Sequence, residues 1–254
     1  RDESLWQLAN PALGTITDIE GLRELYTKAE AIPFEAAKFR RLYLNQFVTS
    51  EEKWIEYDRW LTSAGCVDKD ALKGRACYAG LDLSSKEDIT ALVLVFPWDD
   101  NTFKVLPFFF MPDEAIDRHR KSDKVEYDIW KQQGYIITTP GDVIDYAFVK
   151  AKLNSLMQEY QIKELAYDRW NSGPLIQDLE QCNITLVPFG QGFASMSAPT
   201  KELANLVLQK RLNHGNNPVL NFMADCASVM QDAAENIKIV KPERRKSSKR
   251  VDGL

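Results

Sequence analysis

The feature that most constrains this chain is a carboxylate inside an apolar, strand-like run. Residues 77–96 read CYAGLDLSSKEDITALVLVF, in which Asp82 precedes a short polar break and a second apolar run. A third run, 103–111, follows the turn residues PWDDNT. We therefore predict three consecutive strands with short connections, which form an antiparallel meander. A charge buried in such a sheet needs a partner, which can be an Arg, a set of backbone amides or a metal ion.

Helices and strands alternate in the rest of the chain. Acidic first turns precede amphipathic stretches at 112–134 and 142–160, so we expect helices there, and another over 199–212. The segment KELAYDRW predicts a strand that ends near Asp168, followed by a helix and the strand NITLVPF. This order favours a parallel, right-handed crossover. The predicted fold class is α/β, a mixed sheet whose antiparallel meander continues into parallel strands, with helices on its faces.

The beginning of the chain has a different pattern. Residues 1–75 carry apolar residues at helical spacing in DIEGLRELYTKAEAI and PFEAAKFRRLYLNQF. We predict a helical arm over 1–75 and a separate domain over 76–254. The chain opens without an initiator Met and stops at Leu254, where an apolar segment is beginning, so we expect a fragment of a longer protein.

Several function classes are disfavoured by simple features. The apolar runs are far shorter than the roughly 20 residues of a membrane-spanning helix, and the start has no signal-peptide pattern. The four cysteines lack CxxC pairing, which argues against structural zinc and fits a reducing compartment. No GxxxxGK[ST] sequence occurs, so we do not expect this chain to hydrolyse ATP.

Charge is unevenly distributed. The formal net charge is -5, yet residues 238–250 read KIVKPERRKSSKR, with seven basic residues and one acidic residue. Such a stretch can contact nucleic-acid phosphates, or it can be a solvated tail. Both interpretations stay open on charge alone.

Three separated aspartates are candidates for one metal site. Asp168 lies at the carboxyl end of its predicted strand, beside Asp82 if the two strands are neighbours, and Asp252 begins a segment that can return to the same edge. Carboxylate oxygens suit Mg²⁺ or Mn²⁺. Taken singly, each aspartate can equally be a turn or helix-cap residue.

Several segments together resemble a known family. GLDLSSKEDITALV, AYDRWN, HGNNPVLNFMADCASVMQDAAENIKIVKP and KSSKRVDGL are similar, in order, to motifs of the nuclease domain of tailed-phage terminase large subunits, in the HK97-like branch. ANPALG and FRRLYLNQF resemble the stretch that joins the ATPase domain to that nuclease. The resemblance covers nearly the whole chain. It implies an RNase H-like fold over 76–254, and an arm over 1–75 that comes from a missing ATPase domain.

The resemblance also implies which residues carry the site. Asp82, Asp168 and Asp252 match the family's acids, which bind two divalent ions, Mg²⁺ or Mn²⁺, and we expect Asp82 to be shared by both ions. Family members continue with an apolar helix after the DG pair, so we expect Asp252 to be poorly held here. The residues predicted to hold the DNA backbone are Arg169, Lys246, Lys249 and Arg250.

The implied function is a metal-dependent DNA endonuclease that cuts concatemeric viral DNA during genome packaging by two-metal phosphodiester hydrolysis. The implied partners are double-stranded DNA, the portal protein, the terminase small subunit and the ATPase domain of the same polypeptide, in the host cytoplasm. A non-catalytic DNA-docking module of the packaging motor is the alternative. An actin-like nucleotide-binding protein is disfavoured, because DLSSKED lacks the glycines of a phosphate turn.

Overall fold

The computed structural model of this chain describes residues 3–31, 39–40, 42–46, 52–83, 88–123, 125–168, 173–180, 182, 184–232, 234–241 and 250–254. Two compact units are present, Arg1–Glu52 and Lys53–Leu254. Within the described residues, no helix is both long and apolar enough to cross a membrane.

The first unit is helical, as its sequence pattern predicts. It contains η1 (Glu3–Leu5), α1 (Trp6–Ala9) and α2 (Ile19–Ala31). The Asp18 carboxylate accepts backbone N–H groups at the start of α2, which is how a helix N-terminus is capped. A small aromatic core holds the unit together, with the Trp6 and Phe39 rings packed edge to face at a centroid distance of 5.8 Å.

The division between the units lies earlier than the predicted boundary at 75/76. Helices α4 (Tyr57–Leu61) and α5 (Lys69–Leu72) belong to the second unit. Trp60 of α4 is 1% exposed, stacks on the His214 ring and donates its indole N–H to Asn221 at 2.9 Å. These contacts tie α4 to the core. The origin of the first unit in an ATPase domain stays a prediction.

The second unit is built on one mixed sheet, which confirms the predicted fold class. The strand order is β5-β4-β3-β2-β6-β7, with β8 beside β4. Pairs β2–β3 and β3–β4 are antiparallel, and β2–β6, β6–β7 and β4–β5 are parallel. The strands are β2 (Ala76–Asp82), β3 (Thr90–Trp98), β4 (Thr102–Pro112), β5 (Ile136–Thr139), β6 (Gln161–Asp168), β7 (Thr185–Phe189) and β8 (Leu212–Asn213).

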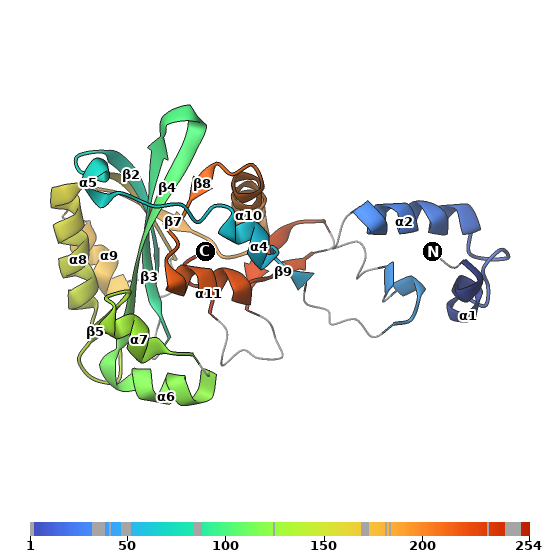
Figure 1. Cartoon of the computed structure of the whole chain (residues 1–254), viewed down its shortest axis with the longest axis horizontal. Coiled ribbons are helices and arrows are strands. Elements are labelled where there is room, and N and C mark those ends of the chain that lie inside the picture. The colour runs from blue at the N-terminus through green and yellow to red at the C-terminus, as the bar shows by residue number, and fades with distance from the viewer. Residues whose placement is uncertain are drawn as a thin grey trace. The chain divides into compact units, whose positions relative to one another are not determined.

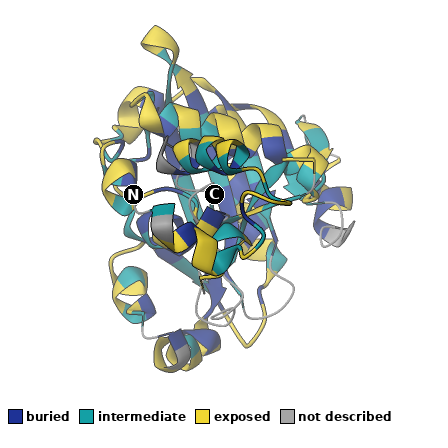
Figure 2. Ribbon diagram, turned by 90° about the vertical axis from the view of Figure 1, so that its right-hand side faces the viewer, coloured by how far each residue is buried: buried dark blue, intermediate teal, exposed yellow. Residues whose placement is uncertain are grey.

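Helices cover both faces of this sheet (Figure 1). One face packs against α8 (Tyr146–Glu159) and α9 (Gly173–Leu179), and the other against α4, α10 (Phe193–Leu208) and α11 (Pro218–Cys226). Successive residues of β3 divide between the two cores because strand side chains alternate in direction: Leu92 faces α8 while Ala91 faces α11. Figure 2 shows the strands buried between helices that are exposed on their outer sides.

Some elements differ from the sequence-based prediction. The expected helix over 112–134 is two helices, α6 (Asp113–Asp123) and α7 (Tyr127–Gln132), followed by the unpredicted strand β5. Asp123 and Tyr127 turn inward and bond to each other at the break. Helix α10 begins at Phe193, and includes Pro199, where we had predicted the start.

A second, small sheet lies after α11. Strands β9 (Ser228–Gln231) and β10 (Ile237–Val240) are antiparallel, and β1 (Glu52–Lys53) completes the order β1-β9-β10. This sheet matters for the site because β10 ends immediately before Lys241. None of the four cysteines, all of which are described, forms a disulfide.

Candidate metal and nuclease site

Asp82 and Asp168 lie side by side at the carboxyl ends of two interior strands, along one edge of the main sheet. Each is the last residue of its strand, and the strands β2 and β6 are parallel neighbours with Leu81 paired to Tyr167. The parallel register therefore carries both side chains to the same edge. This is the arrangement predicted from the two strand ends.

Asp88 reaches the same region from the start of β3. It comes just before buried Ile89, whose N–H donates to Asp88 Oδ1 at 3.3 Å. Its Oδ2 lies 2.9 Å from Lys241 Nζ, and its Oδ1 lies 2.6 Å from Arg250 Nε. From the sequence, Asp88 belongs to the polar turn over 84–88, where it can either support the site from outside the metal ligands or be a turn residue alone.

Asp252 is the third predicted acid, and it is well held rather than loose. Its side chain is 10% exposed, and its Oδ1 lies 3.0 Å from Lys241 Nζ. The following N–H, of Gly253, donates to the Met223 sulfur at 3.2 Å. A Cβ on Gly253 would lie 2.8 Å from the Phe109 ring, so the DG pair needs glycine for this close approach. Packing on β4 and α11 thus fixes Asp252.

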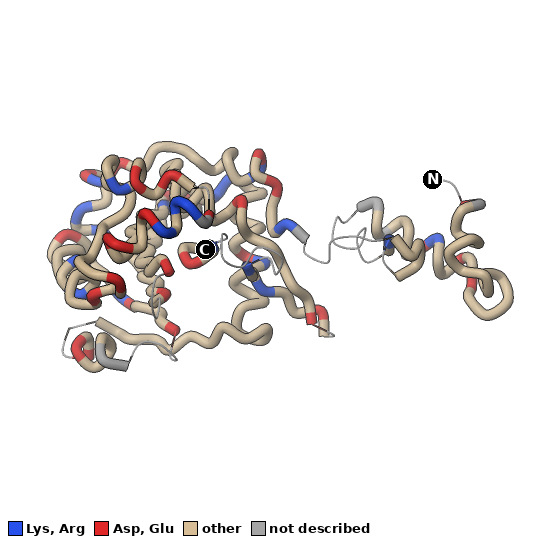
Figure 3. Tube along the Cα trace, turned by 90° about the horizontal axis from the view of Figure 1, so that it is seen from below, with Lys and Arg blue, Asp and Glu red and all other residues tan. Residues whose placement is uncertain are grey.

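The carboxylates interact strongly with one another. Burial and the negative charges of Asp252, Asp168 and Asp88 raise the pKa of Asp82, and Lys241 lowers it, so that the pKa is about 7. Burial also raises the pKa of Asp252, and Asp88 adds to this effect while Lys241 opposes it. Acidic residues lie beside the C-terminal end of the chain (Figure 3). The described acids of this region, Asp82, Asp88, Asp168 and Asp252, therefore lie close enough to affect one another's ionisation.

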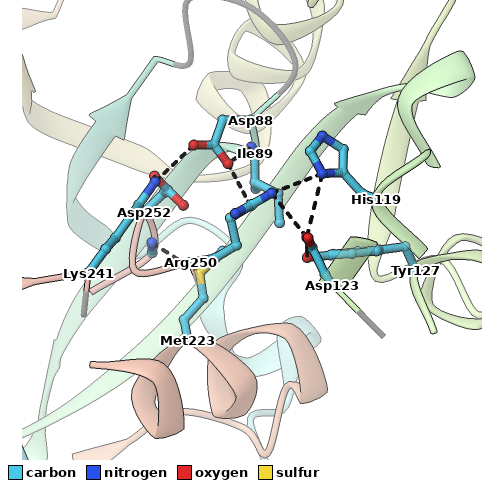
Figure 4. Close-up of polar contacts among 10 residues, drawn as sticks. Asp88, Ile89, His119, Asp123, Tyr127, Met223, Lys241, Arg250 and Asp252 are labelled. Atoms are coloured by element: carbon cyan, nitrogen blue, oxygen red, sulfur yellow. Dashed lines mark hydrogen bonds and ion pairs between the residues drawn. The ribbon is translucent and has the colours of Figure 1, made fainter. Parts of the chain in front are cut away.

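A buried network supports the segment that carries Asp252 (Figure 4). The Arg250 side chain is 3% exposed, and its Nη2 lies 3.0 Å from Asp123 Oδ2 and 3.0 Å from His119 Nδ1. The Tyr127 hydroxyl donates to Asp123 at 3.0 Å. Burial opposes the ionisation of Asp88, yet Arg250 and Lys241 together hold the pKa of Asp88 below its usual value. Arg250 thus links α6 to the loop before β3.

The predicted DNA-binding residues fare differently. The prediction that Arg250 holds the DNA backbone is wrong, because its guanidinium is enclosed between Asp88 and Asp123 and does not face solvent. The other three, Arg169, Lys246 and Lys249, lie outside the described residues. Lys241, which we had counted only within a basic stretch, is the residue that sequence reasoning missed.

The donor set fits a hard divalent cation in its chemistry. Asp252 Oδ2 is buried and has no hydrogen-bond partner in the described structure, and the neighbouring carboxylates repel one another. A cation would relieve both conditions. Among the described residues, however, no three His, Cys, Asp or Glu side chains are grouped closely enough to hold a metal ion as they stand. The cation that bridges two of the acids in this structure is the Lys241 ammonium.

Comparisons with known proteins identify the family. A family model described as "Terminase large subunit, endonuclease domain" matches residues 1–254. The large subunit of the terminase of Enterobacteria phage HK97 is 36% identical over 251 residues, which cover 98% of this chain and 49% of that protein. This chain therefore spans about half the length of that curated relative.

Solved structures agree. The crystal structure of the HK97 bacteriophage large terminase matches with a TM-score of 0.72 and 35% identity, over 99% of this chain and 52% of that one. The large terminase nuclease from thermophilic phage G20c matches with a TM-score of 0.51 and 10% identity, over 79% of this chain and 96% of that one, which shows a shared fold. The mixed sheet is thus the RNase H-like sheet of terminase nucleases. The chain belongs to the family of terminase large subunit endonuclease domains.

Proposed function

We propose that this chain is a metal-dependent DNA endonuclease that cuts concatemeric viral DNA during genome packaging. The observation that carries the proposal is the convergence of separate acids: the charges of Asp168 and Asp252 both raise the pKa of Asp82, which reaches about 7. Residues far apart in sequence influence one another's ionisation only when the fold brings them together. Such clusters of perturbed carboxylates are typical of functional sites.

The residues have distinct proposed roles. Asp82, which interacts electrostatically with both other acids, would be shared by two ions, while Asp168 and Asp252 would each hold one side. Mg²⁺ or Mn²⁺ bound there would supply activation of water and stabilisation of the leaving 3′ oxygen of a phosphodiester. The Asp252 side chain is 10% exposed, so little water would compete with an ion for its oxygens.

Substrate and partners follow from the family. We propose double-stranded DNA as the substrate, held through its phosphates with little base preference. The portal protein, the terminase small subunit and an ATPase domain of the same polypeptide are the proposed partners. The host cytoplasm is the proposed compartment. Arg169, Lys246 and Lys249 remain the proposed phosphate contacts.

The test is cleavage of supercoiled plasmid by the 254-residue chain in Mn²⁺, Mg²⁺ or EDTA. Separate alanine variants of Asp82, Asp168 and Asp252 are compared with Asp178→Ala, which removes an acid of α9 that pairs with Lys150. We expect metal-dependent nicking that each site variant abolishes and Asp178→Ala keeps. Intact plasmid with a folded chain that still binds DNA would favour the non-catalytic docking module.

A further inference from the structure

Lys241 occupies the acidic edge from the solvent side. It follows β10, and its ammonium lies 2.9 Å from Asp88 Oδ2 and 3.0 Å from Asp252 Oδ1. Figure 4 shows its side chain reaching toward both carboxylates. Burial lowers the pKa of Lys241, but Asp252 and Asp88 raise it more, so the ammonium is retained. A positive charge therefore sits where the proposed site would receive a cation.

The two basic residues of this region differ in how firmly they are held. Arg250 is 3% exposed and reaches Asp88, Asp123 and His119. The Lys241 side chain is 26% exposed and its ammonium ends a flexible four-carbon stem. Arg250 is thus a permanent part of the fold, whereas Lys241 can withdraw into solvent without opening the core.

A divalent metal ion would compete with the Lys241 ammonium for the same carboxylate oxygens. Asp88 faces two cations, Lys241 and Arg250, whereas the described ion pairs give Asp252 the Lys241 ammonium alone. A further oxygen, Asp252 Oδ2, stays buried without a hydrogen-bond partner in the described structure. A divalent ion would bring twice the charge to the same oxygens. Both cations cannot occupy one position, because like charges at contact distance repel strongly.

We propose that Lys241 is an internal counter-ion of the metal-free protein, which holds Asp88 and Asp252 together and must leave them when a divalent ion binds. This inference rests on the proposed function, since it requires that these acids bind metal. Its consequence is that Lys241 weakens metal binding. A role in shaping the site would have the opposite consequence, because its removal would then loosen the ligands.

The test is calorimetric titration of Mn²⁺ into the 254-residue chain without DNA, which measures binding rather than activity. Lys241→Met removes the charge and keeps the length of the side chain. We expect its affinity for Mn²⁺ to rise about tenfold, equivalent to ~1.4 kcal/mol. Lys241→Gln should bind Mn²⁺ more tightly in the same way, and it replaces Lys241→Met in the test if the Met variant does not fold. Lys241→Arg retains the charge and should not bind more tightly.

Control variants distinguish the proposed role of Lys241 from the existence of the metal site. Lys238→Met changes a lysine of β10, three residues before Lys241, that lies over the Phe193 ring, and we expect it to leave Mn²⁺ affinity unchanged. Unaltered or weaker binding by both neutral Lys241 variants would overturn the inference, provided that Asp82→Ala still abolishes wild-type binding. Absence of wild-type binding, or binding insensitive to Asp82→Ala, would instead overturn the metal site itself and the inference with it.

Discussion

Removing the Arg250 guanidinium should destabilise the second unit strongly. Its side chain is 3% exposed and it pairs with Asp123, whose side chain is fully buried, and with Asp88. In Arg250→Met the Asp123 carboxylate stays buried, and its bond from Tyr127 does not neutralise it. Breaking a buried pair from one side costs about 3–5 kcal/mol. At about 2–4 °C per kcal/mol, the melting temperature should fall by ~6–20 °C.

The measurement is thermal unfolding of the metal-free chain, followed by circular dichroism, beside two further variants. Arg120→Met removes an arginine that is 50% exposed and lies 3.2 Å from Asp128, so it should cost less than about 1 kcal/mol. Arg250→Met with Asp123→Asn removes both charges of one pair and should recover part of the loss. An Arg250→Met protein as stable as Arg120→Met would refute the buried network.

Three other outcomes follow from the same region. Gly253→Ala should weaken Mn²⁺ binding, because its Cβ would meet the Phe109 ring at 2.8 Å and displace Asp252, whereas Gly192→Ala, with open space around it, should not; equal affinities would contradict this packing. In EDTA, the pKa of Asp82 is raised from its ordinary value of 3.8 to about 7. Protonated Asp82 therefore stabilises the fold fully at pH values below 3.8, and this stabilisation is lost as the pH rises through about 7. The melting temperature should therefore fall from pH 5 to pH 8 by more in wild type than in Asp82→Asn. An equal fall in both proteins would exclude the titration of Asp82 as its cause. Mn²⁺ should raise the melting temperature of wild type but not of Asp82→Asn or Asp252→Asn, and equal shifts in all three would place the metal elsewhere.

Part of the site was predictable because it depends on strand ends. Asp82 and Asp168 close apolar runs, and parallel neighbouring strands bring their carboxyl ends to one edge. The meander was predictable for a similar reason, since its strands are joined by short polar turns. Asp252 is different: its segment and the family resemblance made it a candidate, but its approach depends on packing against α11 and β4, which no local pattern shows.

The basic stretch shows where sequence reasoning stops. Lys241 and Arg250 belong to one run of positive charge, and charge density alone assigns such residues to solvent or to DNA. In the fold, one bridges two acids and the other is buried against Asp123. Which side chain of a charged run turns inward is decided by the surface that the segment meets. That surface includes Asp88 for Lys241 and Asp123 for Arg250, each more than a hundred positions away in the sequence.

The most direct measurement of the central claim is a crystal structure of this chain grown with Mn²⁺, with the ion located by its anomalous scattering. The account predicts anomalous density at the edge of the sheet bounded by Asp82, Asp168 and Asp252, with the Lys241 ammonium withdrawn from Asp88. Saturating Mn²⁺ with no density at that edge, and Lys241 still bridging Asp88 and Asp252, would contradict it.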